Sequence, residues 1–112
     1  MQQYTLDPKA LLGGIIVEDN DQQIVQLALQ KDNEIPPYQT DAIVLLIVLG
    51  GRAQITTEKE SLETHGLQVV RLAPDETHSI RALEDQTTIL VIKQLTHELT
   101  LSEKLRFGQC CL

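Results

Sequence analysis

The chain has 112 residues, 42% of them apolar, and a formal net charge of −7 at pH 7. A single domain is expected at this length, and the acidic balance without a basic cluster argues against binding to a nucleic-acid backbone. Two tyrosines and one phenylalanine are the only aromatic residues, so the core is expected to be aliphatic and single-stranded nucleic acid finds no stacking surface.

The sequence carries no segment typical of secretion or of membrane insertion. Residues 1–9 lack the basic start and the apolar stretch of a signal peptide. The longest apolar run, residues 43–49, is far shorter than the roughly 20 residues that span a bilayer. Cys110 and Cys111 are adjacent and cannot cross-link distant parts of the fold. We therefore expect a soluble protein of the reducing cytoplasm.

The first third of the chain predicts one helical turn and then strands. Asp7 is expected to cap a short helical turn over residues 8–12, with Pro8 at the first helical position. Apolar runs of strand length follow between turn-forming residues, at 15–17, 24–29 and 43–49. The last of these runs is apolar at every position, which predicts a strand covered on both faces.

The rest of the chain continues with short strands between turns. They are expected at residues 53–57, 61–64, 69–72, 79–82 and 87–92. A tight turn is expected at Gly50 and Gly51, and a short helix over residues 98–107 is expected to cover one barrel end. Short strands at this rhythm predict an all-β sandwich or barrel.

Two segments resemble the signature motifs of the cupin family in order and spacing. They are residues 29–51 (LQKDNEIPPYQTDAIVLLIVLGG) and 66–83 (GLQVVRLAPDETHSIRAL). The resemblance covers roughly residues 13–92 and implies one cupin-like domain over residues 1–112, folded as a small jelly-roll β-barrel. In that family the first motif normally supplies two histidines and a glutamate, and the second adds a histidine. Together these four side chains hold a divalent metal.

The four ligand positions of the family are occupied here by Tyr38, Thr40, Val44 and His78. Stable sites for zinc, iron or manganese need about three protein ligands. A tyrosine donates to a metal only as a phenolate, which is costly at a pKa of about 10, threonine is a poor ligand and valine is none. We therefore expect no resident cofactor, with a divalent ion (Zn, Fe, Mn or Ni) held by His78 and unidentified ligands as the alternative.

The resemblance implies that Tyr38, Thr40, Val44 and His78 line the barrel cavity. For His78, a ligand contact and a hydrogen-bonded core histidine are about equally supported. For Tyr38, Thr40 and Val44, a side chain that only fills space in the barrel is better supported than a ligand contact. His65 and His97 are expected to be exposed. Arg52, Arg71 and Arg81 are expected to face solvent, unless one of them pairs with an anionic ligand.

We interpret the chain as a non-catalytic sensor or carrier that binds a small, partly apolar molecule in the barrel. Two alternatives stay open: a metal-dependent oxygenase or isomerase built on His78, and a structural dimerisation module. A homodimer is expected in each case, because so short a barrel with such apolar strands has faces to cover.

Overall fold

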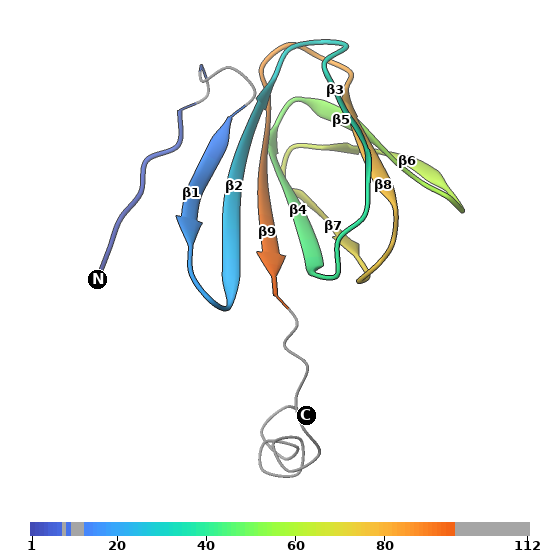
Figure 1. Ribbon diagram of the computed structural model, residues 1–112. Coiled ribbons are helices and arrows are strands. Elements are labelled where there is room, and N and C mark those ends of the chain that lie inside the picture. Colours follow the sequence, from blue (N-terminus) through green and yellow to red (C-terminus); the bar gives the residue numbers. More distant parts are fainter. Residues whose placement is uncertain (8, 10–12, 96–112) are drawn as a thin grey trace.

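The computed structural model describes residues 1–7, 9 and 13–95, and these fold into two antiparallel β-sheets that face each other (Figure 1). The strands are β1 (Gly14–Glu18), β2 (Gln22–Leu29), β3 (Glu34–Tyr38), β4 (Ile43–Gly50), β5 (Arg52–Thr57), β6 (Ser61–His65), β7 (Gln68–Leu72), β8 (His78–Ala82) and β9 (Thr87–Gln94). One sheet has the order β1-β2-β9-β4-β7 and the other β3-β8-β5-β6. The chain crosses repeatedly between the sheets, as in a jelly roll, so the expected all-β fold is confirmed.

The helical expectations fall largely outside the described residues. These include the turn over residues 8–12 and the helix over residues 98–107, and His97, Cys110 and Cys111 lie outside as well. Asp7 makes the contact expected of a cap, because its Oδ1 accepts a hydrogen bond from the Lys9 N–H at 2.9 Å. The described part of the chain holds no helix suited to crossing a membrane.

Strand β3 is the one strand that the sequence pattern did not predict. Its Pro36 and Pro37 have no N–H to donate to a neighbouring strand, which argues against a central position. β3 lies at the edge of the four-stranded sheet and pairs with β8, so prolines are tolerated there. The pairing matches Ile35 with Ile80 and Tyr38 with His78, with a register shift between the two pairs.

The core lies between the sheets and is aliphatic, as predicted. Its buried side chains include Leu29, Val44, Leu46, Val48, Ile55, Leu72, Ile80, Ile89 and Val91. On β4, alternate residues from Val44 onward are fully buried, whereas Leu45 and Ile47 on the outer face keep some exposure. The expectation that residues 43–49 are covered on both faces is therefore wrong for the described chain. The continuous apolar run arises because the outer face is apolar although it is partly exposed.

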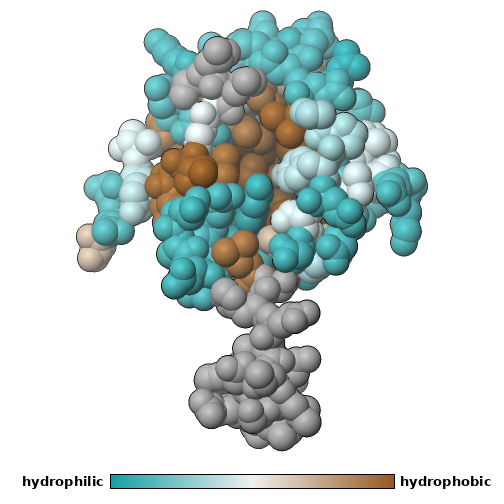
Figure 2. Space-filling view, viewed as in Figure 1, coloured by the Kyte–Doolittle hydropathy of each residue, from teal (hydrophilic) through white to brown (hydrophobic). Residues whose placement is uncertain are grey.

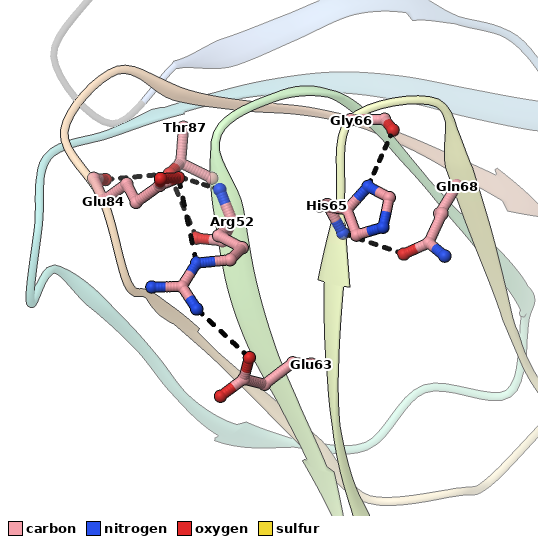
Figure 3. Close-up of polar contacts among 7 residues, drawn as sticks. All are labelled: Arg52, Glu63, His65, Gly66, Gln68, Glu84 and Thr87. Atoms are coloured by element: carbon pink, nitrogen blue, oxygen red, sulfur yellow. Dashed lines mark hydrogen bonds and ion pairs between the residues drawn. The ribbon is translucent and has the colours of Figure 1, made fainter.

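The predicted glycine turn between β4 and β5 is fixed by Thr87 (Figure 3). Gly51 has a φ of 78°, and a Cβ added there would lie 2.4 Å from Thr87 Oγ1, so the position requires glycine. The buried Thr87 hydroxyl donates to the Glu84 carbonyl at 2.8 Å and accepts from the Arg52 N–H at 3.3 Å. On the surface, the Arg52 guanidinium lies 3.3 Å from Glu63 and 3.8 Å from Glu84.

Candidate functional site

His78 begins β8 and points between the two sheets. Ile80 and Ala82, two and four residues further on, lie on the same face of the strand and are also buried. The His78 side chain itself is 1% exposed. Its Nδ1 lies 3.1 Å from the carbonyl oxygen of Glu76, which can only accept, so Nδ1 carries the proton. In the neutral ring Nε2 is then an acceptor.

The Nε2 atom of His78 has no hydrogen-bond partner in the described chain. Among the described residues it is the one buried side-chain nitrogen or oxygen in this condition. An unpaired buried polar atom costs about 1–3 kcal/mol, and nearly all such atoms in native proteins are paired with protein groups, water, an ion or a ligand. Nε2 of His78 is therefore a buried acceptor whose donor is not among the described residues.

Tyr38 ends β3 and contacts His78 directly. The two ring centroids lie 4.3 Å apart and the rings are tilted by 58°, slightly closer than the roughly 4.5–7 Å usual for aromatic pairs. Burial raises the pKa of the Tyr38 phenol above its ordinary value of about 10, so the hydroxyl stays protonated at neutral pH. A phenolate donor to a metal is disfavoured for the same reason.

Lys93 on β9 is a site residue that the sequence interpretation missed. Its Nζ lies 5.3 Å from the centroid of the Tyr38 ring, in the geometry of a cation–π contact. Lys93 is the direct cross-strand partner of the inward-facing Val44, so both residues share the inner face of their sheet. The signal was present in the sequence, since alternation along β9 puts Lys93 in line with the buried Ile89 and Val91.

Val44 and Thr40 take different places. Val44 is fully buried and belongs to the core cluster, so it contributes an apolar wall. Thr40 lies in the loop between β3 and β4, where its hydroxyl accepts from the Ala42 N–H at 3.3 Å and its carbonyl accepts from the Asp75 N–H at 2.7 Å. The structure thus brings Tyr38 and His78 together, whereas the hydrogen bonds of Thr40 hold its own loop against the loop that contains Asp75.

A groove of about 260 Å³ opens between the sheets, and His78, Tyr38 and Lys93 are not among the residues that line it. It is lined by Ile55, Thr57, Glu60, Leu62, Val69, Val70, Arg71, Leu72 and Glu76. Thr57 is the cross-strand partner of His78, on the side away from Tyr38. Of the three arginines considered, Arg71 lines this groove, whereas Arg52 and Arg81 form exposed ion pairs. His65 is exposed, as expected.

Apolar side chains also gather on the face shown in Figure 2, over β2 and β9 and between polar flanks. Val25 and Leu27 on β2 and Ile35 on β3 are partly buried and pack against the core. The interior of the barrel is therefore apolar apart from His78, Tyr38 and Lys93 at its mouth and a few buried polar groups such as Thr64 and Thr87.

These residues do not fit the divalent metal that the resemblance implies. The described residues contain no group of three or more His, Cys, Asp or Glu side chains that could hold a metal ion. His78 is the one donor kept among the four ligand positions, and the ammonium of Lys93 adds a positive charge close to them.

Comparisons with known proteins bear on the fold. No protein-family model and no curated protein matches the sequence. A conserved protein of unknown function from Streptococcus pyogenes is 20% identical, with a TM-score of 0.73 over 84% of this chain and 82% of that one. A cupin superfamily protein from Desulfitobacterium hafniense is 15% identical, with a TM-score of 0.73 over 82% of this chain and 84% of that one.

A third similar structure has a double-stranded β-helix fold. An RmlC-like cupin family protein from Methanocaldococcus jannaschii with a double-stranded β-helix fold is 17% identical and covers 84% of this chain and 90% of its own length, with a TM-score of 0.74. The strand order and the matches agree with the resemblance of the two sequence motifs. The chain therefore has the fold of a small single-domain cupin.

Proposed function

We propose that the protein is a non-catalytic binding module, a sensor or carrier that takes a small, partly apolar molecule at the barrel mouth beside His78. The observation that carries the proposal is the unpaired Nε2 of His78, which is buried and accepts hydrogen bonds. A ligand with a hydroxyl or N–H donor satisfies this atom and removes the cost of leaving it unpaired.

The surroundings of His78 support a ligand with an apolar body. Tyr38 offers an aromatic face, and Val44 and Leu72 offer aliphatic walls. Small-molecule sites commonly combine mostly apolar walls with a few polar groups that fix orientation. One acceptor, one aromatic ring and one ammonium are enough to orient a small molecule, and binding alone requires no further group.

The proposal is tested by identifying what the protein carries. Untagged protein is purified, denatured, and its released small molecules are compared by mass spectrometry with those released from the His78→Phe variant. We expect a compound in stoichiometric amount from the wild type and its loss from the variant. A wild type that releases nothing, and that no member of a metabolite library stabilises against heat, would sink the proposal.

A second proposal concerns assembly: we infer that two copies pair through the β6–β7 flank, defined here by Leu62, Leu67 and Val69. These side chains are 38%, 91% and 60% exposed. Leu67 has a φ of 70°, a conformation that β-carbons disfavour, and still presents its side chain to solvent. Because Leu67 keeps an unfavourable backbone conformation and exposes its apolar side chain, we take it as the residue that contacts the second copy.

The same flank carries a shallow, open groove. The groove has a volume of about 310 Å³ and is lined by Leu62, Glu63, Thr64, Gln68, Val69 and Val70. The backbone N–H of Leu67 donates to the Val48 carbonyl at 2.7 Å, and the His65 N–H donates to Gln68 Oε1 at 2.9 Å (Figure 3), so the turn is held in place. A protruding side chain beside a receptive groove is self-complementary under a twofold axis, which favours a second copy as the partner.

A further inference from the structure

We propose that Lys93 replaces the metal ion as the positive centre of this barrel, so that the ligand is a small carboxylate. This inference rests on the proposed binding function and names the chemical class of the ligand. It starts from the disagreement between the described residues and a divalent metal, together with the position of one lysine.

Lys93 stands among the altered ligand positions. Its strand partner is Val44, the residue at the position of the family's glutamate, and direct cross-strand partners have Cβ atoms about 4.5–5.5 Å apart. Its Nζ reaches across to the Tyr38 ring, at the position of the first histidine. Tyr38 in turn contacts His78, the histidine that is kept. The ammonium is therefore located where a metal would otherwise supply positive charge, and it repels a divalent cation there.

Lys93 is not part of the ion pairs seen among residues 1–7, 9 and 13–95. The ion pairs among the described residues join Arg52 to Glu63 and Glu84, and Arg81 to Asp32. Lys93 pairs with Gln23 on β2, and Gln23 pairs in turn with Glu18 on β1, so Glu18 lies two strands away from Lys93. The Glu18 carboxylate accepts a hydrogen bond from Gln23 Nε2 at 2.8 Å. A partly buried ammonium is most stable beside an anion, and a ligand carboxylate supplies one.

The two polar groups, each in contact with Tyr38, define the chemistry of the ligand. Nε2 of His78 accepts a hydrogen bond, whereas the ammonium of Lys93 donates hydrogen bonds and attracts a negative charge. One ammonium with apolar walls suits a monoanion. A phosphate, with up to two charges and more acceptor oxygens, calls for further donors. The expected ligand thus has a carboxylate, an apolar body and, toward His78, a hydroxyl or N–H group.

The experiment compares probes of equal shape and different charge. Benzoate and benzamide, and isovalerate and isovaleramide, are titrated into ¹⁵N-labelled full-length protein and followed by NMR. The wild type is compared with Lys93→Met, which keeps the length of the side chain, and with Lys93→Arg, which keeps the charge. We expect the carboxylates to bind the wild type about tenfold or more tightly than the amides. That preference persists in Lys93→Arg and disappears in Lys93→Met, whose dispersed spectrum reports an intact fold.

The other outcomes separate the two proposals. If the amides bind as tightly as the carboxylates, or Lys93→Met keeps the preference, the ligand is not chosen by its charge and this inference fails. The binding function then stands provided that His78→Phe abolishes the binding of the amides. If no probe shifts resonances of β8 or β9, both proposals fail. Both also fail if the wild type takes up one zinc, nickel or manganese ion per chain and His78→Ala loses it.

Discussion

Tyr38 and His78 face each other across the β3–β8 pair because β3 carries one extra residue between Ile35 and Tyr38. Ile35 pairs with Ile80 and Tyr38 with His78, so three residue steps on β3 match two on β8. The extra residue is a β-bulge, and it falls at Pro36 and Pro37. Strict alternation from the inward-facing Ile35 would turn Tyr38 outward. The bulge turns its ring inward instead, against His78.

Replacing His78 by phenylalanine should leave the ligand-free protein at least as stable as the wild type. Phenylalanine fills the volume, keeps an aromatic pair with Tyr38 and removes the unpaired Nε2, whose burial costs about 1–3 kcal/mol. The hydrogen bond of Nδ1 to Glu76, worth about 0.5–1.5 kcal/mol, is lost. The free energy of unfolding is measured with denaturant on protein refolded after removal of small molecules.

His78→Ala is the matched control. It removes the same polar atom but leaves a cavity, so we expect a loss of about 2–5 kcal/mol. If His78→Phe proved as destabilising as His78→Ala, Nε2 would have to be paired in the native protein, and the argument for a ligand at this atom would fall.

Much of the fold could be predicted from the sequence, for identifiable reasons. The β-branched runs from β4 to β9 lie between strong turn signals, and eight of the nine strands follow that pattern. Strand β3 was not predicted, because Pro36 and Pro37 argue against a strand unless that strand is known to lie at the edge of a sheet. Which strands form an edge depends on pairing across the whole chain, and local patterns do not encode it.

The site was predicted in part. The resemblance to the second cupin motif implied an inward position for His78, but the contact of His78 with Tyr38 depends on the bulge in β3. Lys93 was missed because a lysine near a strand end is by default assigned to solvent. Its inward direction becomes evident once β9 is paired with β4, which places Lys93 opposite Val44.

Restoring the family's ligand set should create a metal site. The variant with Tyr38→His, Thr40→His and Val44→Glu has four donor residues together with His78. Without metal it should be markedly less stable than the wild type, because Val44 is fully buried and a carboxylate there is poorly solvated. Added zinc or nickel should recover stability in proportion to its affinity. Calorimetric titration measures the stoichiometry and the affinity.

The same restored variant reveals the effect of Lys93. Adding Lys93→Gln removes a positive charge beside the new site, so the metal should bind more tightly than in the triple variant that keeps Lys93. Adding His78→Ala should weaken binding in both backgrounds. Equal affinities with and without Lys93 would mean that its ammonium lies too far from the ligand positions to act as the positive centre.

Gly51→Ala should destabilise the protein by more than the roughly 1 kcal/mol typical of a poorly tolerated backbone position. Gly51 has a positive φ, and the added Cβ would collide with the buried Thr87 at 2.4 Å from Oγ1. Thermal unfolding measures the change. Gly50→Ala is the control, because nothing lies within 4 Å of a Cβ at Gly50. Similar losses in the two variants would show that Thr87 does not restrict the turn.

Leu67→Asn should abolish pairing through the β6–β7 flank without weakening the fold. Asparagine tolerates the positive φ of this position better than leucine does, so the monomer should be as stable as the wild type or more so. The variant loses the most exposed apolar side chain of the flank, which we expect to fill the partner's groove. Sedimentation equilibrium over a range of concentrations should show a dimer for the wild type and a monomer for Leu67→Asn.

Ile15→Thr provides the control for that experiment. Ile15 is 60% exposed, like Val69, but lies on β1 at the opposite edge of the five-stranded sheet. Threonine keeps the β-branch that suits a strand, so only apolar surface is lost. The control should remain a dimer. Each of the two substitutions removes exposed apolar surface from one side of the protein. If Ile15→Thr were a monomer and Leu67→Asn stayed a dimer, the interface would lie at β1 and not at the β6–β7 flank.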